Sequence, residues 1–275
     1  ETILADPRQT AKLVQTLRAD EDVLASLRRH VWDRVADGDG QAIRAFVEKY
    51  RPSLAMLFGP QHLDNLSIVA DARDLIRQAG GEPAFLNYRP AGVPLSAGPF
   101  PAALCVSIND EVVHGLPGNR ILESGDLVGL DLGFKYHSLY TDMAVTVGVG
   151  VISPAAQDLL NVTRNALMVG IATARSGATT GDIGFAIAAA IPDRQKYGIV
   201  TEFGGHGGGH HVHEPPEIPN IGERGRGVRL VPGLVIAIEP MVTIGDGAVM
   251  TAEDGWTVKT RSGEPAAHFE HTVLV

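Results

Sequence analysis

The sequence predicts an α+β protein in which helical segments are followed by strand-rich segments, twice over. Three observations support this prediction. Helical periodicity covers residues 20–50 and 64–79, a second pair of helices is indicated near 153–177 and 181–191, and strand-like stretches fill 103–150 and the chain after 197. This order is typical of a duplicated α+β unit, although no internal sequence repeat supports the duplication.

Residues 1–60 are expected to form a helical N-terminal extension, and residues 61–275 the main domain. Apolar residues recur every fourth position from Val23 to Val35, as on one face of a helix. The segment ADGDG then indicates a turn before a shorter helical pattern. A further helix is expected from about 64 to 79, because Gly80 and Gly81 provide a stop signal.

The central part of the chain alternates between loop and strand signals. Residues 88–102 contain four prolines and are expected to form a loop. LCVSI, LVGLDLGF and TDMAVTVGVG are predicted strands, as are the later segments LVIAIEPMVTI and HFEHTVLV. Between them, Ser153 and Pro154 are suited to the N-cap and first turn of a long helix ending near Gly177.

Composition narrows the class of protein. With 275 residues, 44% of them hydrophobic and 20% charged, the chain has the composition of a globular protein. A net charge of −9 argues against a nucleic-acid binder that relies on overall positive charge. Cys105 is the single cysteine, so neither an internal disulfide nor a thiolate zinc cage can form. The polar start and the lack of a long apolar run predict a soluble, cytoplasmic protein without membrane partners. The protein is also expected to be a monomer.

Four carboxylates interrupt apolar, strand-like segments. They are Asp131 in VGLDLGF, Asp142 in YTDMAVTV, Glu239 in LVIAIEPM and Glu270 in HFEHTVLV. A lone buried carboxylate is costly unless it is paired or binds a metal ion. The two aspartates are eleven residues apart and are expected to face each other across a hairpin. Taken singly, each of the four has the alternative of being an ordinary strand-end charge.

A glycine-rich segment carries four of the ten histidines. GGHGGGHHVHEPPEIPN contains His206, His210, His211 and His213, and its glycines leave room for an ion or ligand. An exposed, flexible loop with incidental histidines is the alternative. The spacing does not match HExxH, which excludes that helical zinc motif.

The carboxylates and the histidine cluster together indicate a site for two divalent cations. Carboxylates can bridge two ions while a neutral imidazole completes the site. Two ions about 3.5–4 Å apart can activate a water molecule and polarise a carbonyl, which suits amide hydrolysis. No GxSxG motif is present, and Cys105 lies in an apolar strand, so a covalent nucleophile is not indicated.

With these residues the sequence resembles the type I methionine aminopeptidases, which have the pita-bread fold. The resemblance covers roughly residues 82–275 and rests on five segments in the family's order: CVSINDEVVHGLP, GLDLGFKYHSLYTDMAVTV, GHGGGHHVHEPP, IAIEPMV, and DGWTVKT followed by FEHT. It implies pseudo-two-fold α+β units around a central antiparallel sheet. It also implies hydrolytic removal of the N-terminal methionine from nascent proteins and peptides.

The resemblance assigns five metal ligands: Asp131, Asp142, His206, Glu239 and Glu270. Asp142 and Glu270 would bridge two ions, and Glu239 would also shuttle protons. The cofactors implied are two divalent ions, Co, Mn, Fe or Zn, and the ligand set does not choose among them.

The resemblance also assigns substrate contacts. His114 matches a histidine that contacts the substrate backbone, and His213 one that stabilises the tetrahedral intermediate. The methionine pocket would draw on four residues, Tyr88, Phe100, Cys105 and Trp256. The chain departs from the family in a longer loop over 89–99 and in Val212, which stands where an aromatic residue is common. The resemblance also implies a ribosome contact as one of the protein's partners.

Three rival hypotheses remain. An X-Pro peptidase can share the fold, but Glu202 stands where those relatives usually carry histidine, and His-Thr follows Glu270 as in methionine aminopeptidases. A catalytically inactive binding protein predicts missing ligands, whereas all five are present. A metal-buffering protein would need only the histidine-rich loop, so this hypothesis does not explain the four carboxylates.

Overall fold

The computed structural model describes residues 72–90, 93–118 and 120–275, together with the helical residues 8, 10, 11, 13, 15, 45, 49 and 50. The chain divides into two compact units. The first comprises Glu1–Gly80, Pro101–Ala103 and Pro117–Ile121, and the second comprises Gly81–Phe100, Leu104–Leu116 and Leu122–Val275.

In the first unit, residues 72–78 are helical and a turn follows at residues 79 and 80. Gly80 has a φ of 77°, the left-handed conformation that glycine adopts readily after a helix. The C-terminal part of the helix expected over 64–79 is therefore confirmed. Most of the expected helices within 20–50 and the expected boundary at residue 60 lie outside the described residues, so the separate extension stays a prediction.

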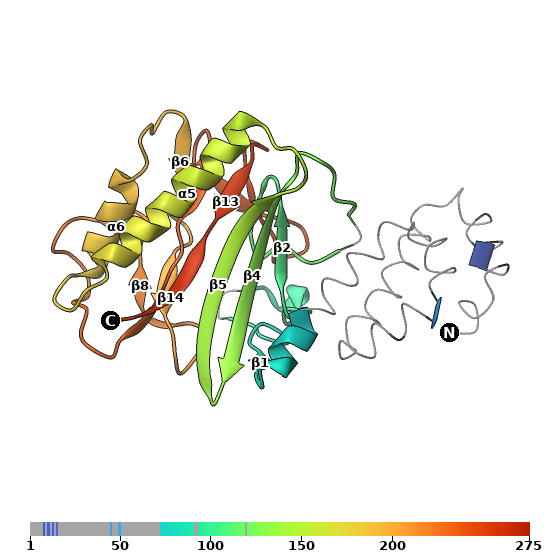
Figure 1. The fold of residues 1–275 in the computed structure, drawn as a ribbon, viewed down its shortest axis with the longest axis horizontal. Helices are drawn as coiled ribbons and strands as arrows, with labels where there is room; N and C mark the ends of the chain where they lie inside the picture. Colours follow the sequence, from blue (N-terminus) through green and yellow to red (C-terminus); the bar gives the residue numbers. More distant parts are fainter. Residues whose placement is uncertain are drawn as a thin grey trace. The chain divides into compact units, whose positions relative to one another are not determined.

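The second unit is built on an eight-stranded antiparallel sheet with the order β1-β4-β5-β14-β9-β7-β8, in which β2 also pairs with β4 (Figure 1). The strands are β1 (Glu82–Pro83), β2 (Cys105–Ile108), β4 (Leu127–Tyr136), β5 (Leu139–Gly148), β7 (Gly205–Gly207), β8 (Glu214–Ile218), β9 (Val235–Ile238) and β14 (Glu270–Leu274). The three segments predicted as strands between 103 and 150 are confirmed as β2, β4 and β5. Because β14 pairs with β5, the last strand of the sequence lies beside a strand from the middle of the sequence.

Two three-stranded sheets complete the β-structure. One has the order β13-β10-β6 and the other β11-β12-β3. Their strands are β3 (Glu111–Val113), β6 (Tyr197–Ile199), β10 (Met241–Ile244), β11 (Val249–Thr251), β12 (Val258–Thr260) and β13 (Ala266–His268).

Two segments expected as single buried strands are each divided between sheets. LVIAIEPMVTI supplies β9 and β10, and HFEHTVLV supplies β13 and β14. Pro240 lacks an N–H and cannot extend the ladder of β9, which explains the first break. The change of sheet places Glu239 just after β9 and Glu270 at the start of β14, so both lie where two sheets meet.

Two helices follow the β4–β5 hairpin, α5 (Pro154–Thr173) and α6 (Thr180–Ala189). The Ser153 hydroxyl accepts a hydrogen bond from the Ala156 N–H, so the predicted N-cap is confirmed. The predicted end near Gly177 is a few residues too late. Gly177 has a φ of 93° and its N–H donates to the Leu230 carbonyl, so this part of the chain has already turned away to pair elsewhere.

The helices cover the sheet and form the main hydrophobic core. α5 packs against α6 and crosses β13 and β14 (Figure 1). Leu159 of α5 and Ile187 of α6 are fully buried in one cluster with Ile236 of β9 and Phe269. This packing fixes the strands that carry the two glutamates. Within the described residues, no helix has the length and apolar character needed to span a membrane.

Candidate metal centre

The two aspartates project from one face of the β4–β5 hairpin. Asp131 is opposite Ala144, and Asp142 is opposite Gly133. The aspartates are therefore diagonal neighbours, two residues out of direct register, and side chains two apart on a strand share a face. Both are buried, with 9% and 8% of their surface exposed. The expected meeting of the two across a hairpin is confirmed, with this offset.

Strand β14 adds Glu270 to the same face. Glu270 pairs with Ala144 from the side opposite to Asp131, so the three residues form a row across β4, β5 and β14. The small Ala144 side chain leaves space between the two carboxylates. Thr272 locks the register: its hydroxyl accepts from the Asp142 N–H at 2.7 Å and donates to the Asp142 carbonyl at 2.9 Å.

His206 reaches the carboxylates from β7. A Cβ on the preceding Gly205 would lie 2.2 Å from the Ala237 carbonyl oxygen, so only glycine allows β7 to approach β9 so closely. His206 Nδ1 lies 2.8 Å from the Gly207 carbonyl, which can only accept, so Nδ1 carries the proton. In the neutral ring Nε2 is then free to bind a metal ion, and it faces Glu239 Oε1 at 3.5 Å and Glu270 Oε1 at 3.9 Å. This is the tautomer that a metal-ligating imidazole requires.

The cluster carries more buried negative charge than its protein partners neutralise. Burial raises the pKa of Asp131 to about 6 and that of Glu239 to about 7. Burial, with the neighbouring carboxylates, raises the pKa values of Asp142 and Glu270 well above the usual range. Asp131 Oδ1 and Glu270 Oε1 have no hydrogen-bond partner.

Divalent cations fit this donor set. The groups Asp142-His206-Glu270 and Glu239-His268-Glu270 each offer ligand atoms that lie within 4.8 Å of one another. Bound cations would neutralise the buried charge and engage the unpartnered oxygens.

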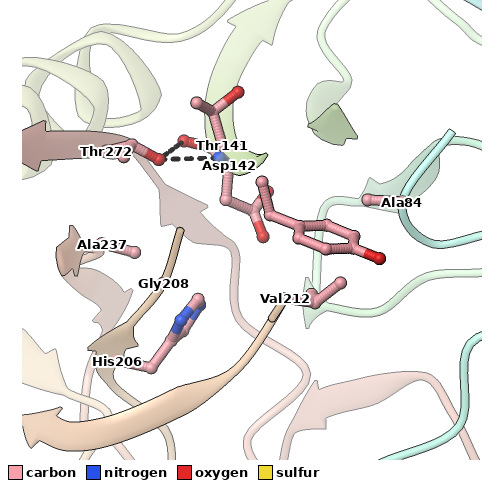
Figure 2. Close-up of a pocket in the computed structure, with 9 residues that line it drawn as sticks. Ala84, Thr141, Asp142, His206, Gly208, Val212, Ala237 and Thr272 are labelled. Carbon is pink, nitrogen blue, oxygen red and sulfur yellow. Dashed lines mark hydrogen bonds between the residues drawn. The ribbon is translucent and has the colours of Figure 1, made fainter. Parts of the chain in front are cut away.

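A small pocket opens beside the centre. Figure 2 shows the Asp142 carboxylate and the His206 ring turned into a common space, with Val212 at its edge. Ala84, Tyr140, Thr141, Gly208, Ala237 and Thr272 also line it. None of the four residues expected for the methionine pocket belongs to this lining.

The two predicted substrate histidines lie near the same centre. The His213 ring centroid is 4.3 Å from that of His206, although much of the His213 side chain is exposed. Desolvation and the neighbouring imidazoles lower the pKa of His213 to about 3. His114 follows β3 with a φ of 58° and packs edge-on against Phe203. Burial, together with His268 and His206, lowers its pKa to about 4. Both rings are therefore neutral at pH 7.

Tyr88 contacts a catalytic candidate. Its hydroxyl lies 2.7 Å from His213 Nδ1, and the two rings are stacked at 5.3 Å. Burial and the charge of Asp142 raise the pKa of the Tyr88 phenol, so the hydroxyl keeps its proton and can donate.

The other three predicted pocket residues fall into two groups. Phe100 and Trp256 form an edge-to-face pair with centroids 5.1 Å apart. The Trp256 indole N–H donates to the Ala97 carbonyl at 3.3 Å, so the longer loop over 89–99 helps to hold this ring. Cys105 is buried in β2 opposite Asp131, and burial raises the pKa of its thiol well above the usual value.

Two residues of the site were missed by sequence reasoning. Phe203, which packs on His114, sits in an irregular segment without a periodic signal. His268 lies 3.4 Å from Glu239 through its Nε2 and is 4% exposed. Its spacing of two from Glu270 was the available signal, because residues two apart on an extended chain face the same side.

Comparison with known proteins places this geometry in a family. Metallopeptidase family M24 matches residues 33–275. The chain is 47% identical over 211 residues to a methionine aminopeptidase of Aquifex aeolicus, covering 74% of this chain and 79% of the relative. It is 45% identical over 201 residues to a methionine aminopeptidase of Treponema pallidum, covering 73% and 74%. The crystal structure of methionine aminopeptidase from Thermotoga maritima superposes with a TM-score of 0.69 at 38% identity, covering 78% of this chain and 80% of that one.

Proposed function

Because this chain belongs to the methionine aminopeptidases of metallopeptidase family M24, we propose that it removes the N-terminal methionine from nascent polypeptides with two divalent cations. The observation that carries this proposal is the convergence of the five expected ligands in one buried centre. Asp131, Asp142, His206, Glu239 and Glu270 come from four strands and one strand break of a single sheet system.

The cations would be held by these five residues, with Asp142 and Glu270 shared between them. When bound, such ions supply a reactive water and polarise the scissile carbonyl. Co, Mn, Fe and Zn are all compatible with a set of carboxylates and imidazole.

Glu239 is proposed to move protons during the reaction. A carboxylate held beside the ions can act as a general base and then as a general acid. Its position directly after β9, with one oxygen 3.5 Å from His206, holds it at the centre of the cluster.

His213 is proposed to donate a hydrogen bond to the oxygen of the scissile carbonyl as negative charge develops there. Tyr88 supports this role because its hydroxyl determines which ring nitrogen of His213 carries the proton. A phenol that donates to Nδ1 leaves the proton of a neutral ring on Nε2, which then becomes a donor. His114, whose ring is kept neutral by burial, is proposed to contact the substrate backbone.

The apolar residues Phe100, Trp256 and Cys105 are proposed to receive the methionine side chain, together with Tyr88. The edge-to-face aromatic pair offers the kind of surface that a thioether contacts favourably. A preference for a small second residue follows from the family. Since the substrates are newly made chains, we propose that the enzyme acts in the cytoplasm, as a monomer.

The test is peptide hydrolysis by metal-stripped protein, titrated with Mn or Co, on Met-Ala-Ser and on Ala-Pro-Ser. Release of methionine from the first peptide alone, dependent on added metal, supports the proposal. Cleavage of Ala-Pro-Ser instead would indicate an X-Pro peptidase. Absence of cleavage of both peptides, with two ions bound per chain, would indicate a binding protein.

His210→Gln is a matched control for the histidine assignments. His210 is exposed in the same glycine-rich segment, yet it is not among the predicted ligands or substrate contacts. Its replacement should leave hydrolysis of Met-Ala-Ser unchanged.

A further inference from the structure

His268 is a buried histidine at the metal centre that belongs to no part of the expected ligand set. It is the last residue of β13, two positions before Glu270, and only 4% of its surface is exposed. Its backbone is fixed to β5 by two hydrogen bonds with the Thr146 hydroxyl, at 2.8 and 2.9 Å. Its ring Nε2 is completely buried and has no hydrogen-bond partner. A buried polar atom without a partner is costly, and therefore points to a missing one.

The position of Nε2 mirrors that of the expected ligand His206. His206 Nε2 lies 3.5 Å from Glu239 Oε1 and 3.9 Å from Glu270 Oε1. His268 Nε2 lies 3.4 Å from Glu239 Oε2 and 3.9 Å from Glu270 Oε2. The two imidazoles therefore face opposite oxygens of the same pair of carboxylates at matching distances.

The 3.4 Å distance from His268 Nε2 to Glu239 Oε2 suits a cation between the two atoms better than a direct hydrogen bond. Two ligand atoms, each about 2.1 Å from one ion, are roughly 3.0 to 3.4 Å apart when the angle at the ion is between square and tetrahedral. A direct N–H···O bond is shorter, at about 2.9 Å. Glu239, His268 and Glu270 also bring their ligand atoms within 4.8 Å of one another.

We propose that His268 is a sixth metal ligand, so that the centre presents one imidazole on each side of the Glu239–Glu270 pair. This inference rests on the proposed function, because it assigns a further ligand to the same centre. In this arrangement His206 would bind one ion and His268 would bind the other.

A second imidazole changes the metals that the centre prefers. Imidazole nitrogen suits Zn and Fe, whereas Mn is best served by carboxylate and water oxygens. The centre is therefore expected to discriminate more strongly in favour of Zn over Mn than a centre with a single histidine.

The deciding experiment counts the histidines bound to a probe ion in the intact protein. The chain is labelled with ¹⁵N-histidine, stripped of metal and loaded with ¹¹³Cd alone, and ¹¹³Cd–¹⁵N couplings are measured by NMR. Two coupled imidazoles are expected in the unsubstituted protein, one of them lost in His268→Gln. Glutamine keeps a neutral polar side chain of similar reach, which limits the structural disturbance.

His271→Gln is the matched control, because His271 is an exposed histidine on β14 three residues away. It should keep both couplings. Coupling to His206 alone in the unsubstituted protein would overturn the proposal while leaving the metal centre intact. Cadmium binding without coupling to any histidine would overturn both this assignment and the proposed function.

A second readout uses metal affinity, measured by calorimetry. In His268→Gln the ratio of Zn to Mn affinity should fall at least about tenfold. An unchanged ratio, with both ions still bound, would contradict a direct bond to His268.

Discussion

Asp131→Asn in the metal-free protein tests whether the buried negative charge of the cluster destabilises the folded chain. Burial raises the pKa of Asp131 from 3.8 to about 6 in the folded chain. As the pH rises, the unfolded chain therefore loses this proton first, and folded stability falls from about pH 4 until the folded pKa is passed. A difference of about 2 pKa units corresponds to roughly 3 kcal/mol, of which about half falls between pH 5 and 8. Asparagine cannot ionise, so the Asp131→Asn variant does not lose this stability as the pH rises.

The assay is urea unfolding in the presence of a chelator, followed by circular dichroism, at several pH values from 5 to 8. The variant should gain about 1 to 2 kcal/mol over the unsubstituted protein across this range. With Mn or Zn added, the order should reverse, because ions that bind only the folded state stabilise it by about 2.7 kcal/mol at 100 times Kd. The variant loses part of this binding.

Glu217→Gln on β8 is the control, since Glu217 is exposed and lies outside the cluster. Its stability difference should not change with pH. A difference between Asp131→Asn and the unsubstituted protein that is constant over the whole range, or grows toward low pH, would refute the reasoning about buried charge.

Three further substitutions test the centre. Asp142→Asn should abolish turnover of Met-Ala-Ser with an unchanged circular dichroism spectrum; near-normal activity would contradict the two-metal assignment. His213→Ala should lower kcat by about 10²-fold, as for loss of an oxyanion donor, whereas a raised KM with intact kcat would make it a binding residue. Gly205→Ala should lower both stability, by at least about 1 to 3 kcal/mol, and metal affinity measured by calorimetry, because the new Cβ meets the Ala237 carbonyl. Normal metal affinity in this variant would show that β7 can move without displacing its histidine.

Much of the candidate site is readable along the chain because each carboxylate is locally conspicuous. Asp131 and Asp142 interrupt apolar, alternating strands, and Glu239 and Glu270 follow or precede apolar runs. A charge in such a place needs compensation, and this energetic argument depends only on neighbours in the sequence. Helix starts are equally local, since a hydroxyl N-cap acts within one turn, as at Ser153.

The expectations that needed distant partners were less accurate. The end of α5 depends on Gly177 pairing with Leu230, fifty-three positions later. The division of the last two strand segments depends on which sheet each half joins, and apolar runs are alike on either side of the break.

The sequence by itself predicted the fold class and, through its resemblance to known proteins, the family, while the apolar neighbours of the four carboxylates made these acidic residues conspicuous. Only the tertiary structure decided that Tyr88 binds His213, and that His268 faces the same glutamates as His206. Such relations join residues from separate strands and loops. They are set by sheet order and register, which depend on long-range packing rather than on any neighbouring residue.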